Sequence, residues 1–188
     1  EDARRKLEWL IGSIVAGDSK RIQKFAVLYG PPGSGKSPVL NILELLFQGY
    51  TTTFDAGALG SKSDQFATSS LGKSSLVAID QDGDLSRIES NGLLNSIVAH
   101  ETILINEKGG RRYPKRINAI LFVGTNKPVK ITDSKSGIIR RLIDISPTGN
   151  KLDVSEYQTL MTQVRDELGK IANHCLGVYR SLGKHYYD

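Results

Sequence analysis

Cysteine is almost absent from this chain of 188 residues, which contains only Cys175. A single thiol excludes an internal disulfide framework and a zinc site built from several cysteines. The three histidines are scattered and lack the spacing of metal ligands: His100, His174 and His185. Such low cysteine use fits a reducing, intracellular setting.

Long apolar runs are also missing. No segment is apolar enough to span a membrane and none has the pattern of a secretory signal, so we expect no membrane partner. The net charge of +5 permits a polyanionic partner without requiring one. With 39% hydrophobic and 24% charged residues, the composition is that of one globular domain. Helical sequence already runs at Glu1, which favours a domain cut from a longer protein.

Helical and strand patterns alternate along the chain. Apolar residues at helical spacing predict an N-terminal helical segment over 1–24. Short runs that are apolar on both sides, separated by helices, predict an α/β core over 25–150 with a mainly parallel sheet covered on both faces. Asp153 and Glu156 form a capping-box pattern, so 151–188 should contain one long helix from Val154. The core strands are predicted at 25–29, 51–54, 75–79, 120–123 and 142–145, with helices at 38–47, 61–71 and 93–98.

A phosphate-binding motif follows the first predicted strand. Its glycines allow backbone N–H groups to surround phosphates at the start of a helix. Lys36 would reach the β- and γ-phosphates of ATP, and the Ser37 hydroxyl would coordinate Mg²⁺. A glycine-rich turn that binds nothing is the alternative, but the position between an apolar strand and an amphipathic helix favours ATP. The motif comprises Gly30, Pro31, Pro32, Gly33, Ser34, Gly35, Lys36 and Ser37.

An acidic cluster follows the strand predicted at 75–79. Asp80 is placed to hold Mg²⁺ through water, although a solvated turn would also contain such residues. Gln81 stands where a glutamate usually polarises the attacking water. A glutamine can hydrogen-bond to water but cannot accept its proton. Either Asp82 takes that role or the chain hydrolyses ATP poorly; a glutamate-to-glutamine change that traps ATP would look the same.

Two further pieces lie downstream. Asn126 follows the strand at 120–123, where it could contact the γ-phosphate or the attacking water; an Asn-Lys-Pro turn is the alternative. Arg140 and Arg141 precede the last strand, and an ordinary surface ion pair would explain them as well.

A basic hairpin is predicted between these pieces, with Gly109 and Gly110 at its turn. Positive charge on a thin projection suits the gripping of a phosphate backbone without reading bases. The alternative is a charged, solvated hairpin with no ligand. The basic residues nearest the turn are Lys108, Arg111 and Arg112, with Lys115 and Arg116 further along.

Taken in order, the phosphate motif, the Asp80 strand, the Asn126 motif and the arginine pair resemble superfamily 3 helicases. The similarity covers about 17–147 and is strongest to the helicase half of phage and large-virus primase-helicases. It implies an AAA+-like P-loop core and a homo-oligomeric, hexameric ring with ATP between subunits. Asn126 would be the sensor and Arg140 or Arg141 the arginine finger. The hairpin, with Lys108 nearest its tip, would grip single-stranded DNA in the channel.

The resemblance also implies DNA helicase activity in viral or phage replication, in the cytoplasm of a host cell. A primase or polymerase domain on the same polypeptide would be a partner. Two other functions remain open. A P-loop small-molecule kinase would need a lid and an acceptor pocket, but not a basic hairpin or paired arginines. A nucleotide-gated DNA-binding module with little turnover would be compatible with Gln81.

Overall fold

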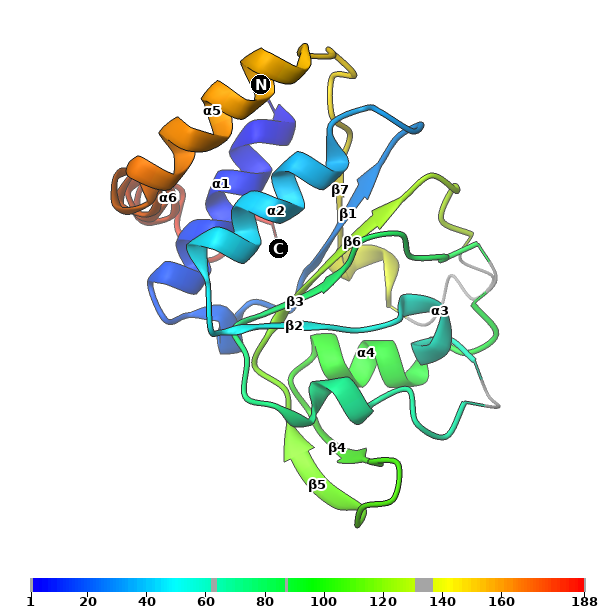
Figure 1. The fold of residues 1–188 in the computed structure, drawn as a ribbon. Coiled ribbons are helices and arrows are strands. Elements are labelled where there is room, and N and C mark those ends of the chain that lie inside the picture. Colours follow the sequence, from blue (N-terminus) through cyan, green and yellow to red (C-terminus); the bar gives the residue numbers. More distant parts are fainter. Residues whose placement is uncertain (1, 62–63, 87, 131–136, 188) are drawn as a thin grey trace.

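The computed structural model describes residues 2–61, 64–86, 88–130 and 137–187. A five-stranded sheet with the order β2-β3-β6-β1-β7 forms its centre (Figure 1). All four strand pairings are parallel, which confirms the predicted sheet. Its strands are β1 (Phe25–Tyr29), β2 (Thr51–Thr53), β3 (Val77–Asp80), β6 (Ile120–Thr125) and β7 (Leu142–Ile145).

Helices cover both faces of the sheet. On one face lie α1 (Asp2–Val15), α2 (Lys36–Leu46) and α6 (Leu168–Leu182); on the other lie α3 (Ala56–Leu59), α4 (Gly92–Val98) and the 3₁₀ turn η2 (Ser69–Gly72) (Figure 1). Alternate residues of β1 belong to different cores. Phe25 and Val27 pack with α3 and α4, whereas Ala26 and Leu28 pack with α1 and α2. Burial on both faces explains why the strand is continuously apolar.

Because the strands are parallel, all their carboxyl ends meet at one edge of the sheet, which we call the carboxyl edge. The opposite one is the amino edge. In the strand order, β6 separates β1 from β3. The segments that follow these three strands therefore lie side by side, although they are far apart in the sequence. Ligands of open α/β sheets bind at this kind of edge.

The basic hairpin forms as predicted. Strand β4 (Thr102–Ile105) pairs antiparallel with β5 (Tyr113–Arg116), and Thr102 faces Arg116 across the pair. Gly109 has a φ of +74°, a conformation that glycine adopts without steric cost. The Gly110 N–H donates to the Glu107 carbonyl at 3.0 Å and closes the turn. In Figure 1 the hairpin projects at the bottom of the view from the amino edge, away from the helices α1, α2 and α6.

The single long C-terminal helix predicted from Val154 is wrong. Two helices, α5 (Val154–Asp166) and α6, meet at Glu167, whose φ and ψ of −113° and 12° interrupt the helix. The capping box at Asp153 and Glu156 is present, as predicted. The break turns α6 onto α1, where Gly12 approaches so closely that a Cβ would lie 2.1 Å from the Cys175 carbonyl oxygen. Burial raises the pKa of the Cys175 thiol to about 11 in this contact.

The helix predicted over 61–71 is also wrong. Residues 62 and 63 lie outside the described residues, and the segment from 64 onward consists of turns that end in η2. Tertiary hydrogen bonds replace the helical ones: the Thr68 hydroxyl donates to the Leu104 carbonyl at 3.2 Å, and Thr52 donates to the Ser70 carbonyl at 2.9 Å. Helix α3, only four residues long, was not predicted. Within the described part of the chain, no helix has the length and apolar character that crossing a membrane requires.

Candidate active site

The loop between β1 and α2 closes on its own lysine. Gly33 and Gly35 have φ angles of +77° and +98°, a conformation that residues with a Cβ atom rarely adopt. Lys36 is only 8% exposed, and its Nζ donates to the Gly30 and Pro31 carbonyls at 2.6 and 2.9 Å. Ser37 is exposed at the first turn of α2. The lysine therefore holds a positive charge inside the loop, where phosphate oxygens would replace the carbonyls.

Asp80 ends β3 and is partly buried. Its Oδ2 accepts a hydrogen bond from the Ala56 N–H at 2.8 Å, and its Oδ1 accepts one from the Asp82 N–H at 3.3 Å. Burial raises the pKa of this carboxyl above the ordinary aspartate value despite these bonds. The following turn has room only for a glycine, because a Cβ on Gly83 would lie 2.7 Å from the Asp80 carboxylate.

These residues fit a hydrated Mg²⁺ ion. The partly buried Asp80 carboxylate and the exposed Ser37 hydroxyl are hard oxygen ligands of the kind that Mg²⁺ prefers. No group of three His, Cys, Asp or Glu side chains forms a metal cage among the described residues. Such a cage is not needed, since Mg²⁺ in phosphate sites usually takes one or two protein oxygens together with water and phosphate.

Asn126 lies beside the acidic cluster. Its Nδ2 donates to the Asp82 Oδ1 at 3.3 Å, while the Gly30 N–H donates to the Thr125 carbonyl at 3.2 Å and brings the phosphate loop alongside. Gln81 turns instead toward α2, where its Nε2 donates to the Asn41 Oδ1 at 3.4 Å. Three separate motifs thus converge at the carboxyl edge, and Asp82, rather than Gln81, contacts the asparagine.

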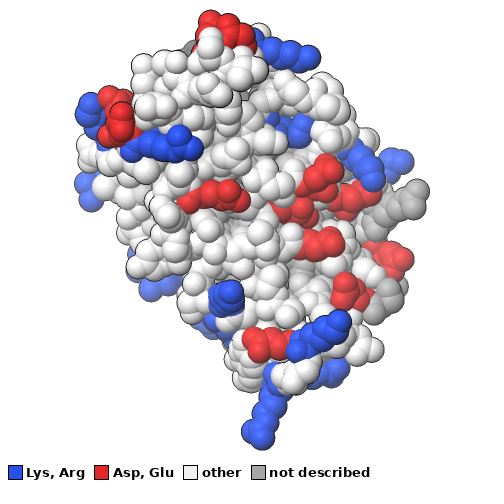
Figure 2. All heavy atoms as spheres, in the orientation of Figure 1, with Lys and Arg blue, Asp and Glu red and all other residues white. Residues whose placement is uncertain are grey.

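A nearby ion pair with Lys127 compensates the charge of one acidic residue, Asp84. The Lys127 Nζ lies 2.5 Å from the Asp84 Oδ2, and its hydrogen bond holds the pKa of Asp84 far below the ordinary range. Figure 2 shows carboxylate side chains gathered on the right-hand side of the view, around the ends of β3 and β6. The charge of the carboxyl edge outside the loop is therefore mainly negative.

The arginine pair lies at the opposite edge. Arg140 and Arg141 belong to the 3₁₀ turn η4 (Ile139–Arg141), directly before Leu142, which pairs with the first residue of β1, Phe25. Arg141 is partly buried, and its Nη1 donates to the Asn95 Oδ1 of α4 at 2.9 Å. The side chain of Arg140 is exposed. The fold therefore separates this pair from the phosphate loop of the same chain and gives its two members different surroundings.

The hairpin divides its basic residues between two roles. Lys108, Arg111 and Arg112 are exposed near its tip, where Figure 2 shows basic side chains at the bottom of the view. Lys115 instead donates to the Gly72 carbonyl at 2.7 Å and anchors the hairpin to η2. The Tyr113 hydroxyl donates to the Glu107 Oε1 at 2.7 Å, a hydrogen bond that raises the pKa of the tyrosine.

Sequence reasoning missed a cavity beside the phosphate loop. It measures about 550 Å³ and joins the loop to the C-terminal segment. Lys151 reaches across Gly33, where an added Cβ would lie 3.3 Å from the lysine Cε. No local pattern marks the α5 side of this cavity, because only the tertiary fold brings it to the loop. The lining includes Lys36, Ser37, Pro38, Leu152, Tyr157 and Leu160.

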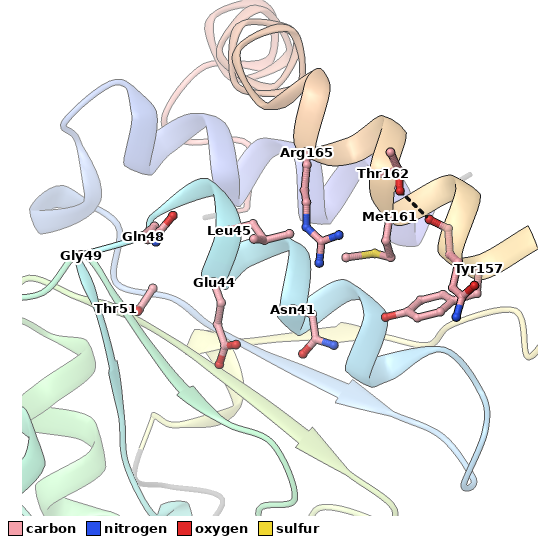
Figure 3. A pocket seen from close by; sticks show the side chains of 11 residues that line it. Asn41, Glu44, Leu45, Gln48, Gly49, Thr51, Tyr157, Met161, Thr162 and Arg165 are labelled. Atoms are coloured by element: carbon pink, nitrogen blue, oxygen red, sulfur yellow. Dashed lines mark hydrogen bonds between the residues drawn. The ribbon is translucent and has the colours of Figure 1, made fainter. Parts of the chain in front are cut away.

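A second hollow, of about 780 Å³, runs between α2 and α5. Figure 3 shows Asn41 and Glu44 of α2 on one side, with Tyr157, Met161 and Arg165 of α5 on the other. Tyr157 lines both hollows. Helix α5 therefore stands over α2 without a closely packed contact along this side.

The fold and the loop define an α/β domain of the P-loop class with an AAA+-like arrangement of strands. A family model described as "Family of unknown function (DUF5906)" matches residues 28–141, and the chain belongs to this family. The matched region runs from β1 through η4 and leaves out α5 and α6. Comparison with curated proteins finds no match.

Solved structures show the same fold. A structure of the NrS-1 C-terminal region superposes with a TM-score of 0.69 at 18% identity, covering 97% of this chain and 43% of that one. A second structure of this region gives a TM-score of 0.65 at 18% identity, covering 91% and 39%. The chain thus spans less than half of these relatives. A structure of JCV helicase is more distant, with a TM-score of 0.46 at 13% identity, covering 96% and 53%.

Proposed function

We propose that this chain is the ATP-driven motor domain of a DNA helicase or translocase that acts in viral or phage DNA replication. The observation that carries the proposal is the division of the sheet between its two edges. The phosphate loop, Asp80, Asp82 and Asn126 converge at the carboxyl edge, while the arginine pair and the basic hairpin lie at the amino edge. A motor needs both a hydrolytic site and a separate surface for its track.

In the proposed reaction, Lys36 and the loop amides bind the β- and γ-phosphates of ATP. Ser37 and Asp80 would hold Mg²⁺, which neutralises charge on the phosphates when bound. Asp82 accepts the proton of the attacking water, and Asn126 orients that water from the position where it contacts Asp82. The contact of 3.3 Å between these two side chains supports Asp82 over Gln81 as the base.

The arginine finger acts on the ATP of a neighbouring subunit in this proposal. Strand β1 has five residues, so its ends are roughly 13 Å apart at about 3.3 Å per residue. Since the arginine pair lies next to the first residue and the phosphate loop follows the last, neither arginine reaches the loop of its own chain. We assign the finger to Arg140, which is exposed, and an anchoring role to Arg141, which Asn95 holds.

Single-stranded DNA is the proposed track. The exposed cations near the hairpin tip form no part of the sheet cores. Lys115 anchors the hairpin to η2, and the hydrogen bond from Tyr113 to Glu107 braces it internally. A rigid positive projection binds phosphates of any sequence. The fold shared with the NrS-1 C-terminal region is compatible with this assignment, which rests on the residues of this chain.

The test is to measure particle size and ATPase rate of this chain with and without single-stranded DNA. We expect particles of the size of a ring, a hexamer in the simplest case, and ATP hydrolysis that single-stranded DNA stimulates. Lys36→Ala should abolish nucleotide binding while the far-ultraviolet circular dichroism spectrum stays unchanged. If Lys36→Ala binds nucleotide as tightly as the unmutated chain, the loop is not the phosphate site. ATP and DNA binding without turnover would identify a nucleotide-gated binding module instead.

A further inference from the structure

Apolar side chains are exposed beside the phosphate loop, where a polar surface would be expected. Among the described residues, eight large hydrophobic side chains are exposed, and three of them fall between 152 and 160. Leu152 is 51% exposed and Leu160 is 40% exposed, and both line the cavity that adjoins Lys36 and Ser37. Tyr157, partly buried, lines the same cavity.

Packing within the protein does not account for this apolar surface. Helix α5 buries only Met161 and Val164, so most of its length does not belong to a core. Figure 3 shows Tyr157 projecting from α5 toward the N-terminal end of α2, next to the hollow that separates the two helices. Tyr157 and Leu160 are three residues apart and therefore lie on the same side of α5.

The strand order gives the loop two distinct sides. On one side of β1 lie β6, which Asn126 follows, and β3, which ends at Asp80. On the other side lies β7, which leads to α5. The terminal phosphate of a bound nucleotide would face the acidic side, where Asp82 and Asn126 meet. Its nucleoside would then leave the loop toward Ser37, Pro38 and the cavity under α5.

We infer that this cavity binds the purine base of the nucleotide, with Leu152, Tyr157 and Leu160 as an apolar platform. This inference rests on the proposed function and extends it to residues outside the region matched by the family model. Lys151, which crosses Gly33, adds a cation close to the phosphates. Binding of the base attaches α5 to the P-loop core, although the protein itself packs that side of α5 only loosely.

The platform should discriminate little between purines. Stacking and apolar contact tolerate different bases, because every base presents an aromatic face. Among the side chains that line the α5 side of the cavity, Asn150 is the only amide. We therefore expect adenine and guanine nucleotides to bind within about tenfold of each other, which corresponds to about 1.4 kcal/mol. A pyrimidine has less surface to bury and should bind more weakly.

The experiment separates the base from the phosphates. Affinities of the β,γ-imido analogues of ATP and GTP, of CTP, and of inorganic tripolyphosphate are measured by calorimetry on the 188-residue chain. The variants are Tyr157→Ala and Leu160→Ala. The matched control is Val154→Ala, which removes an apolar side chain that is 74% exposed on the same helix but does not line the cavity.

We expect each platform variant to bind the ATP analogue about tenfold more weakly, as the loss of stacking on one base implies. Its affinity for tripolyphosphate should not change, and Val154→Ala should bind both ligands normally. Unchanged binding of the ATP analogue in both platform variants would overturn the inference alone. An equal loss of affinity for tripolyphosphate and for the ATP analogue would also overturn it, because α5 would then act through the phosphate loop and not through the base. If the unmutated chain binds neither ligand, the proposed function fails and the inference fails with it.

Discussion

At the carboxyl edge of the sheet, polar side chains are held by hydrogen bonds within the protein, whereas at the amino edge the cations of Arg140 and the hairpin tip are exposed to solvent. Lys36, Asp80 and Asp82 each form hydrogen bonds within the protein. Under the proposed function, this contrast separates the two tasks of the P-loop domain. A hydrolytic site has to be preorganised before its substrate arrives. A surface that meets a partner or a nucleic acid needs its charges exposed.

The arginine pair tests this comparison most severely. We expect Arg140→Ala to lower the ATPase rate of the assembled protein by about 10³–10⁵-fold, because a finger stabilises the charge of the transition state. Nucleotide affinity should change far less than the rate, because the finger acts mainly on the charge that develops in the transition state. Arg141→Ala should mainly lower thermal stability, because its hydrogen bond to Asn95 joins η4 to α4.

A mixing experiment decides whether the finger acts between subunits. Lys36→Ala subunits keep Arg140, and Arg140→Ala subunits keep the phosphate loop. Mixed assemblies, verified by gel filtration, should recover part of the ATPase activity that both variants lack alone. Mixed rings that remain inactive would contradict the assignment of Arg140 in trans. An Arg141→Ala chain that is inactive alone but recovers activity when mixed with Lys36→Ala subunits would exchange the roles of the two arginines.

Within the carboxyl edge, the next prediction distinguishes Asp82 from Gln81 as the general base. Asp82→Asn should lower the ATPase rate by about 10²–10⁴-fold, as expected when a general base is removed. Gln81→Glu should leave the rate within the same order of magnitude, because Gln81 turns toward Asn41 on α2. Steady-state ATPase assays measure both. A large increase in Gln81→Glu together with an active Asp82→Asn would show that position 81 carries the catalytic role.

The hairpin prediction concerns binding to DNA. Replacement of Lys108, Arg111 and Arg112 by alanine should weaken binding of single-stranded DNA equally for all sequences. The slope of log affinity against log salt should fall by roughly 0.7 for each lost phosphate contact. ATP binding should persist. The matched control replaces three exposed cations on other elements, Lys20, Lys170 and Arg180, and should leave the slope unchanged. A sequence-dependent loss would argue against contacts to the backbone.

The smallest effect concerns the pH dependence of stability at Asp80. Burial raises the pKa of this carboxyl in the folded chain, so the folded state binds its proton more tightly than the unfolded state does. The Asp80 contribution to stability is therefore most favourable at low pH and falls as pH rises from the ordinary aspartate value of 3.8 through the raised value. Urea unfolding at several pH values should show the unmutated chain losing stability relative to Asp80→Asn over this window. A gain over the same window would contradict the direction of the pKa shift.

Much of the fold could be read from local patterns. Runs such as Phe25–Tyr29 are apolar on both sides, and the helices α2, α4 and α5 follow the strands β1, β3 and β7. These features predict a parallel sheet with two covered faces. They failed where tertiary contacts replaced local ones. Thr68 bonds to Leu104 rather than continuing a helix, and Glu167 breaks the C-terminal helix so that α6 packs on α1.

The sequence by itself determined the phosphate loop, since the spacing of Gly30, Lys36 and Ser37 suits only a few backbone geometries. It also determined the hairpin and its charge, because a glycine turn between two short strands is a local structure. Only the tertiary structure decided that Asp82 contacts Asn126, that Arg141 is anchored while Arg140 is exposed, and that α5 adjoins the loop. Side-chain direction depends on packing between elements that are distant in the chain, and no local periodicity encodes it.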